Sequence, residues 1–338
     1  MRPLALAASA LVAPGKGILA ADESIAAVSA WLSMAGVVPT QQNRRAFREM
    51  LITTPGLAAG ISGVILGDET FRQQLRAGTA FPVALRELGL MPGVRVDSGA
   101  GPLAGSQGER VTEGLDGLLP RLRQYAELGA QFAAWRAVLR IGPRTPSAVA
   151  VRANAQALAR YAAACQDAGL VPVVAPEVLV DGRHTLGHCE TVTSMVLLAV
   201  MSELHEYGVD AEAVVLAPSM ALPGAGSGEQ PGPAEVAEAT LGTLAGVPVM
   251  LAGVAFGAGG QHPEQATEHL AALQRIPHLW PLTFSFGRAL AGPALAAWRG
   301  EPGNWRAGQR ALARRVTMNA AALAGRYRPE WAAGLDPA

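Results

Sequence analysis

Residues 13–24 read APGKGILAADES, in which a Pro-Gly-Lys-Gly turn leads into a short apolar run that ends at Asp22. A short apolar run bounded by glycine on one side and by charged residues on the other predicts a buried strand over 18–22. Further runs of this kind each precede a segment with helical periodicity, such as 147–168 and 190–207. They predict strands over 61–66, 94–97, 132–141, 171–177, 213–218, 247–255 and 283–286.

The alternation of strands and helices is typical of a parallel sheet. Eight such units in one chain predict an α/β fold of the (β/α)8, or TIM-barrel, type. The Gly- and Pro-rich segments 223–233 and 257–260 are predicted to be loops that follow strands. No charge run or low-complexity linker divides the chain, so we expect a single domain over 1–338.

The bulk composition argues against several classes of partner. Charged residues make up 16% of the chain and the formal net charge is zero, so we expect no nucleic-acid interface. No apolar stretch is long and uninterrupted enough to predict a membrane span. Cys165 and Cys189 have neither metal-ligand spacing nor the pattern of a secreted disulfide framework, which favours a cytoplasmic location. We expect no cofactor.

The chain has one lysine, Lys16, and all its other basic residues of the Lys/Arg type are arginines. The active sites of TIM barrels lie at the carboxyl ends of the strands. Lys16 precedes the first predicted strand, so we expect it in a solvated turn at the opposite end of the barrel. A general preference for arginine explains most of the missing lysines, but it does not explain a lysine replaced by alanine.

The segment 13–24 resembles the opening of the class I, or Schiff-base, fructose-bisphosphate aldolases, and the resemblance extends over roughly residues 4–328. It implies a TIM barrel, a phosphorylated sugar or triose as ligand and a homotetramer. Its other motifs are Asn43-Arg44-Arg45, Gly63-Val64-Ile65-Leu66, Pro102-Leu103-Ala104-Gly105 and Gly114-Leu115-Asp116-Gly117-Leu118.

Three positions that the resemblance implies to be catalytic hold alanine. Ala217 stands where the family has the lysine that forms the Schiff base, in a Leu-Lys-Pro-x-Met context. Ala134 replaces a second lysine before Trp-Arg, and Ala175 replaces the first glutamate of Glu-Pro-Glu. A methyl group cannot condense with a ketone to form an iminium. Because the three alanines end adjacent strands, we expect them to share one enlarged, less charged cavity.

The main phosphate pocket of the family is retained in the sequence. Glycines let backbone N–H groups approach phosphate oxygens, and an arginine adds charge-assisted hydrogen bonds. The second phosphate site is not retained, because Ala27 and Trp31 replace a serine and an arginine. Arg95 replaces a lysine and keeps its charge. Our candidate ligand-binding residues are Gly259, Gly260, Ser285, Gly287, Arg288 and Arg95.

Asp22, Glu177 and Arg136 keep the identities that the family has at these places. Without a lysine beside it, Asp22 loses one stabiliser of its charged form, so we expect its pKa to rise. Two interpretations stay open for Asp22: a general base, or a partner of Arg136 in an ion pair. His262 follows the glycine loop and is a further candidate for the cavity.

A metal-dependent mechanism would need histidine or carboxylate ligands. His184 and His188 have an i, i+4 spacing, but Gly182 and Gly187 argue against a helix there. His205, His269 and His278 have the context of surface or helix residues. We therefore expect no metal site.

Three hypotheses for function follow. The first is a pseudoenzyme that has lost Schiff-base aldol catalysis and retains a sugar-phosphate-type pocket. The second is a repurposed enzyme in which Asp22, Glu177 or His262 carries out acid–base chemistry on a phosphorylated sugar or carbonyl compound without an imine. The third is a working fructose-bisphosphate aldolase of glycolysis, which would need an amine from elsewhere.

Overall fold

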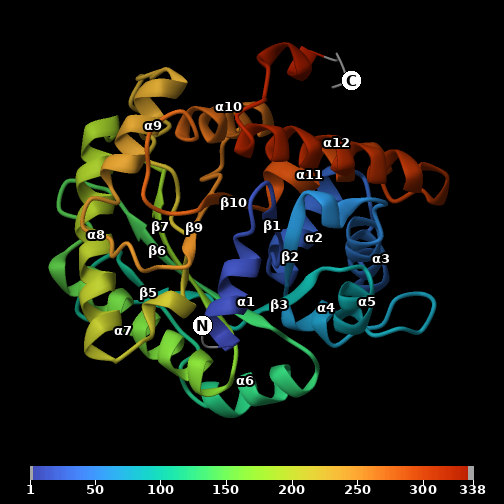
Figure 1. Ribbon diagram of the computed structural model, residues 1–338, viewed down its shortest axis with the longest axis horizontal. Coiled ribbons are helices and arrows are strands. Elements are labelled where there is room, and N and C mark those ends of the chain that lie inside the picture. Colours follow the sequence, from blue (N-terminus) through green and yellow to red (C-terminus); the bar gives the residue numbers. More distant parts are fainter. Residues whose placement is uncertain (1–2, 334–338) are drawn as a thin grey trace.

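Parallel strands close into a barrel in the computed structural model, which describes residues 3–333 (Figure 1). The order around the barrel is β1-β10-β9-β8-β7-β6-β3-β2, and β1 closes it by pairing with both β10 and β2. The predicted (β/α)8 fold is confirmed. The strands are β1 (Gly17–Ala21), β2 (Ile61–Leu66), β3 (Met91–Arg95), β6 (Phe132–Arg140), β7 (Val171–Leu179), β8 (Val215–Leu216), β9 (Gly253–Gly257) and β10 (Leu282–Phe286).

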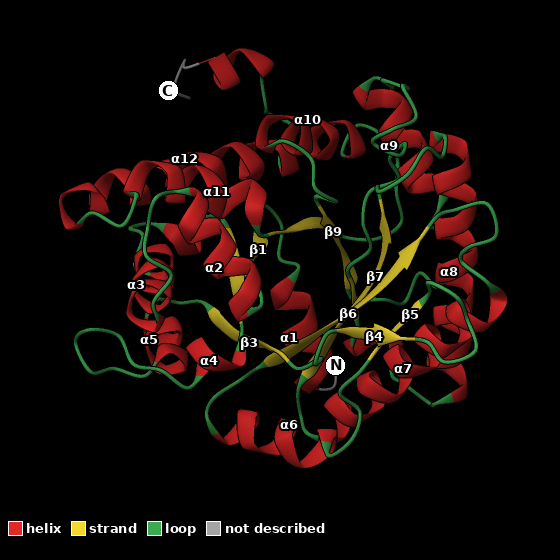
Figure 2. Ribbon diagram, turned by 180° about the vertical axis from the view of Figure 1, so that it is seen from behind, coloured by secondary structure: helices red, strands yellow, loops and turns green. Residues whose placement is uncertain are grey.

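Most helices surround the barrel on its outside, whereas α1 lies near the middle of the ring in both ribbon views, and α12 lies along α11 (Figures 1 and 2). Short 3₁₀ turns occur at Leu57–Ala59, Ala211–Ala213, Pro302–Asn304 and Pro329–Ala333. The helices are α1 (Pro3–Leu11), α2 (Ile25–Met34), α3 (Gln41–Ile52), α4 (Asp68–Phe71), α5 (Phe81–Glu87), α6 (Leu118–Glu127), α7 (Ala148–Asp167), α8 (Leu186–Glu206), α9 (Pro233–Gly242), α10 (Pro263–Leu273), α11 (Arg288–Trp298) and α12 (Trp305–Leu323).

Several predicted boundaries are wrong. The strand expected over 247–255 begins only at Gly253, because Val249 and Met250 lie exposed in a turn whose Pro248 carbonyl accepts from the Trp280 indole. The strand expected over 94–97 ends at Arg95. A hairpin of β4 (Ala100–Pro102) and β5 (Arg110–Thr112) was not predicted. Both ends of the domain expected over 1–338, residues 1–2 and 334–338, lie outside the described residues.

The helix after β7 also differs from the prediction. Thr185 caps α8 by accepting a hydrogen bond from the N–H of His188, so the helix starts at Leu186 despite Gly187. His188 is therefore helical, whereas His184 precedes the helix. The cap outweighs the low helix propensity of one glycine in the first turn.

The amino end of the barrel is filled. Ala8, Leu11 and Val12, from α1 and the residue after it, pack in one buried cluster with Ile18 of β1 and Phe132 of β6. Phe132 packs against β3 where a glycine leaves room for its ring: a Cβ on Gly93 would lie 2.1 Å from that ring. Side chains therefore fill the amino end of the barrel, and the cavity described below lies at the carboxyl ends of the strands.

Candidate functional site

A cavity of about 330 Å³ opens at the carboxyl end of the barrel. The interior strand positions that form its floor are apolar, and charged residues from the strand ends form its wall. Lys16 does not line it. The floor residues are Ala20, Ile65, Ala134, Val173, Ala175 and Ala217, and the wall residues include Asp22, Glu23, Arg95, Asp97, Arg136, Glu177 and Arg288.

The three alanines lie together, as the sequence predicts. Arg95 of β3 is in register with Ala134 of β6, and Ala134 is in register with Val173 of β7. The N–H of Ala217 donates to the carbonyl of Val174, one residue before Ala175. Ala134 and Ala217 keep 7% and 8% of their surface exposed, which shows that only methyl groups face the cavity at these points.

Arg95 and Asp97 form a two-pronged ion pair beside the alanines. The Arg95 Nη2 and Nε donate to the two Asp97 carboxylate oxygens over 2.6 and 2.9 Å, and the Asp97 side chain is fully buried. The carboxylate also accepts from the N–H groups of Gly99 and Arg136. Burial lowers the pKa of Arg95, but the hydrogen bonds and charge of Asp97, together with the charges of Asp22 and Glu177, raise it by more, so this guanidinium stays charged.

Asp22 follows β1 and lines the cavity without an ion-pair partner among the described residues. Of the two interpretations left open for Asp22, the ion pair with Arg136 is wrong: Arg136 Nη1 lies 3.2 Å from Oε2 of Glu177 instead. Burial raises the pKa of Asp22, while the charges of Arg95 and Arg136 partly oppose the rise. The expected direction is confirmed, but the main cause is burial rather than the missing lysine.

Glu23 and Ser24 are site residues that the sequence analysis missed. Glu23 lines the cavity and pairs with buried Arg48 from α3, while burial raises its pKa and Arg48 opposes the rise. Ser24 lines the cavity and caps α2. Both directly follow Asp22 at a strand end, so their position in the sequence was a usable signal. Gln261 and Ser219 also line the cavity, and their placement depends on loop geometry that the sequence does not display.

The glycine loop after β9 and the start of α11 form one side of the cavity. Gly259 and Gly260 have φ values of +59° and +85°, a left-handed backbone that favours glycine. Gly287 precedes α11, and a Cβ there would lie 2.9 Å from the carbonyl oxygen of Ala20. The glycine loop and a helix N-terminus thus bring backbone N–H groups to the cavity, next to Ser285 and exposed Arg288.

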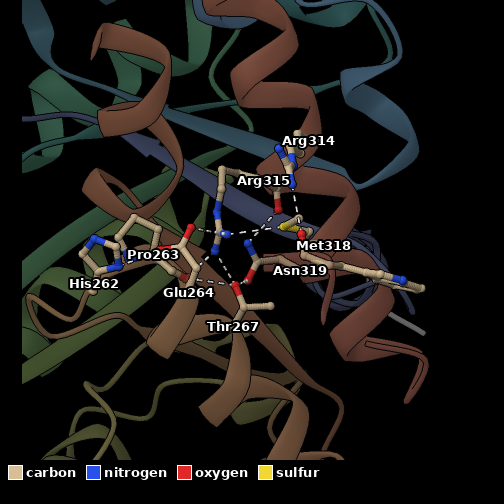
Figure 3. A network of polar contacts seen from close by, with 9 residues as sticks. His262, Pro263, Glu264, Thr267, Arg314, Arg315, Met318 and Asn319 are labelled. Atoms are coloured by element: carbon tan, nitrogen blue, oxygen red, sulfur yellow. Dashed lines mark hydrogen bonds and ion pairs between the residues drawn. The ribbon is translucent and has the colours of Figure 1, made fainter. Parts of the chain in front are cut away.

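His262 does not line this cavity, so the prediction that it is a candidate for the site is wrong. Its ring is 79% exposed and its Nδ1 lies 2.6 Å from Glu264, outside the loop (Figure 3). Gln261 lines the cavity instead. Its side chain is held in place because its amide donates to the carbonyl of Ala258 over 2.7 Å and its oxygen contacts buried His269. Burial lowers the pKa of His269 to about 4, so this ring is neutral near pH 7.

A polar network anchors the end of the glycine loop to the last long helix. Arg315 of α12 is buried and donates to Glu264 over 3.1 Å and to Thr267 over 2.5 Å, and it also contacts the carbonyl of Pro263 (Figure 3). Asn319 contacts Thr267 over 3.0 Å. These bonds fix the first turn of α10, and with it one end of the loop that carries Gly259 and Gly260.

Over residues 3–333, no group of three or more His, Cys, Asp or Glu side chains is arranged to hold a metal ion. His184 is buried, and burial lowers its pKa. Within the same range, none of the helices has the length and apolar character of a membrane span.

A family model for "Fructose-bisphosphate aldolase class-I" matches residues 3–336. The chain belongs to the class I fructose-bisphosphate aldolase family. A probable fructose-bisphosphate aldolase class 1 from Xanthomonas campestris pv. campestris is 47% identical, over 96% of this chain and 98% of that protein. Fructose-bisphosphate aldolase C from Rattus norvegicus is 46% identical, over 94% and 88%.

The family assignment extends to the fold. A structure of fructose-bisphosphate aldolase from Plasmodium falciparum, in complex with TRAP and a small-molecule inhibitor, superposes with a TM-score of 0.94. It is 39% identical and covers 96% of this chain and 95% of that one. The resemblance stated from the sequence motifs is thus confirmed for family and fold.

Proposed function

We propose that this aldolase homologue binds a phosphorylated small molecule in the cavity and does not form a Schiff base. The observation that carries the proposal is the methyl-lined floor formed by Ala217, Ala134 and Ala175. The motif resemblance assigns these three positions to catalytic side chains of the family. Imine formation needs an amine within reach of the ketone. The one lysine, Lys16, precedes β1 and is separated from the cavity by the filled barrel interior around Phe132.

The charge distribution of the cavity supports binding of a phosphate. Arg95 is neutralised by Asp97 and Arg136 by Glu177, whereas Arg288 forms no ion pair or hydrogen bond with any residue in 3–333. An unpaired guanidinium beside two left-handed glycines and a helix N-terminus is well suited to a phosphate dianion. The loops after the last two barrel strands are a frequent phosphate site in this fold.

A second candidate is acid–base catalysis without an imine. The raised pKa of Asp22 favours it, because a carboxyl group whose pKa moves toward neutrality is a more effective proton carrier near pH 7. Glu177 is held by Arg136 on the neighbouring side of the cavity. In this reading the cavity retains its phosphate site and Asp22 exchanges a proton with the bound carbonyl compound. Turnover that Asp22→Asn abolishes would identify it.

Calorimetric titration with dihydroxyacetone phosphate tests the binding proposal. We expect saturable binding that Arg288→Ala weakens by about tenfold or more, because a charge-assisted phosphate contact is lost. Arg306→Ala is the matched control, since Arg306 is an exposed arginine on α12 away from the cavity. Equal affinity of the Arg288→Ala variant and the control would refute the phosphate site.

A further inference from the structure

Trp31 lies where the cavity meets a groove on the surface. The indole lines both the cavity and a groove of about 680 Å³ between α2 and α11, which lie side by side in both ribbon views (Figures 1 and 2). The cavity and the groove thus share a wall at Trp31 and Arg288. The other groove residues are mostly small or apolar: Met34, Ala35, Gly36, Gly292, Leu295, Ala296 and Arg299.

Arg288 is positioned to serve both hollows. Its Cζ lies 5.2 Å from the centroid of the Trp31 ring, within the range of a cation–π contact. The N–H groups of a guanidinium lie in its own plane, so a cation–π contact leaves them available to bind a phosphate. The contact with Trp31 therefore uses none of the hydrogen-bond donors of Arg288.

The surface beside Arg288 is apolar and open. Trp31 is half-buried, its indole N–H donates to no residue in the described range, and Met34 of the same helix is 81% exposed. Ala27, one turn earlier on α2, also lines the cavity. At Ala27 and Trp31 a second phosphate would meet no cation, so it would have to share Arg288 or reach Arg299, the other arginine that lines the groove. The wall formed by Ala27 and Trp31 therefore favours an uncharged end of the ligand.

We propose that Trp31 forms a subsite for an uncharged aromatic ring, carried by a phosphomonoester whose phosphate is held by Gly259, Gly260 and Arg288. This inference rests on the phosphate pocket proposed above and narrows its ligand to one class. A planar ring matches the site better than a flexible chain, because it can contact the indole and the guanidinium together through aromatic and cation–π contacts. Met34 is a flexible side chain that can close over the ring.

Calorimetric titrations of the whole protein with small probes test this ligand class. The probes are inorganic phosphate, phenyl phosphate, cyclohexyl phosphate and fructose 1,6-bisphosphate. We expect phenyl phosphate to bind about five- to tenfold more tightly than inorganic phosphate and more tightly than cyclohexyl phosphate, because aromatic stacking adds to apolar contact. Fructose 1,6-bisphosphate is expected to bind more weakly than phenyl phosphate.

Variants of Trp31 locate the effect. Trp31→Ala should remove the advantage of phenyl phosphate and change the affinity for inorganic phosphate by less than about threefold. Trp31→Arg should shift the preference toward fructose 1,6-bisphosphate, because it adds a cation for a second phosphate. Leu279→Ala, at a side chain that is 72% exposed and lines neither hollow, is the control for loss of surface apolar area.

The outcomes separate this inference from the phosphate pocket. If phosphate binding depends on Arg288 but phenyl phosphate gains nothing over phosphate or cyclohexyl phosphate, the aromatic subsite is refuted and the pocket stands. The same holds if Trp31→Ala leaves the gain intact. If no probe binds, or if Arg288→Ala has no effect on any probe, the phosphate pocket fails and the phosphomonoester class fails with it.

Discussion

Asp97→Asn is expected to be the most destabilising conservative change in the cavity wall. The Asp97 carboxylate is fully buried, accepts two hydrogen bonds from Arg95 and accepts one N–H each from Gly99 and Arg136. It therefore ties the end of β3 to the following loop and to β6. Asparagine has the same shape, but it removes the charge and directs an amide NH₂ toward groups that are already donors.

The magnitude follows from these contacts. Removing one partner of a buried ion pair costs about 3–5 kcal/mol. We take about 3 kcal/mol, because the Arg95 side chain is 16% exposed and Asp22 and Glu177 remain near it. A chain of 338 residues has an unfolding entropy of about 0.7 kcal/mol per degree. The melting temperature should therefore fall by about 4 °C.

Urea unfolding and scanning calorimetry measure this loss against a matched control. Asp181→Asn also removes a carboxylate from an arginine, Arg140 at 3.3 Å, but both side chains are more than 60% exposed, at 66% and 62%. An exposed pair of this kind contributes at most about 1 kcal/mol. Equal destabilisation by Asp97→Asn and Asp181→Asn would refute the reasoning that burial and multiple hydrogen bonds make Asp97 important.

Other predictions concern proton linkage, packing and assembly. Burial raises the pKa of Asp22 above its ordinary value of 3.8, so the folded protein favours the protonated carboxyl group. The protonated group stabilises the fold below pH 3.8, and this stabilisation is lost as the pH rises through the pKa of the folded state. Asp22→Asn should therefore gain stability over wild type between pH 4 and pH 7 in urea titrations, and a constant difference would contradict this. Gly93→Ala should cost about 1–3 kcal/mol in the same assay, because its Cβ would clash with Phe132; an unchanged midpoint would mean that the ring moves freely. Light scattering should give four times the chain mass of 34.8 kDa, and the mass of a monomer would refute the expected tetramer. Calorimetry should show one unfolding transition, and two separate transitions would refute the proposed single domain.

The barrel was predictable from the sequence because its strands are short apolar runs whose ends are marked by glycines and charged residues. Residues Ile61–Leu66 were placed correctly for that reason. The strand expected over 247–255 was misplaced because apolar character does not separate a strand from an apolar turn, and Val249 and Met250 are exposed. The residues at which a strand begins and ends therefore depend on its hydrogen-bond partners in neighbouring strands, and the sequence alone does not show those partners.

The candidate site was predictable to the extent that it lies at strand ends. Ala134, Ala175 and Ala217 were expected to share a cavity, and they do, because adjacent parallel strands end at the same rim. The pairing of Arg136 with Glu177 rather than Asp22, and the entry of Gln261 in place of His262, depend on side-chain directions set by the loop and by the network around Arg315. Residue spacing alone contains no information on these directions.

The loss of Schiff-base chemistry is tested most directly by reductive trapping. The protein is incubated with dihydroxyacetone phosphate and borohydride and its intact mass is measured, with a class I aldolase that retains its lysine as the positive control. We predict no covalent adduct, because Ala217 offers a methyl group and Lys16 lies at the amino end of the filled barrel. A stoichiometric adduct, at Lys16 or at the amino terminus, would contradict the account.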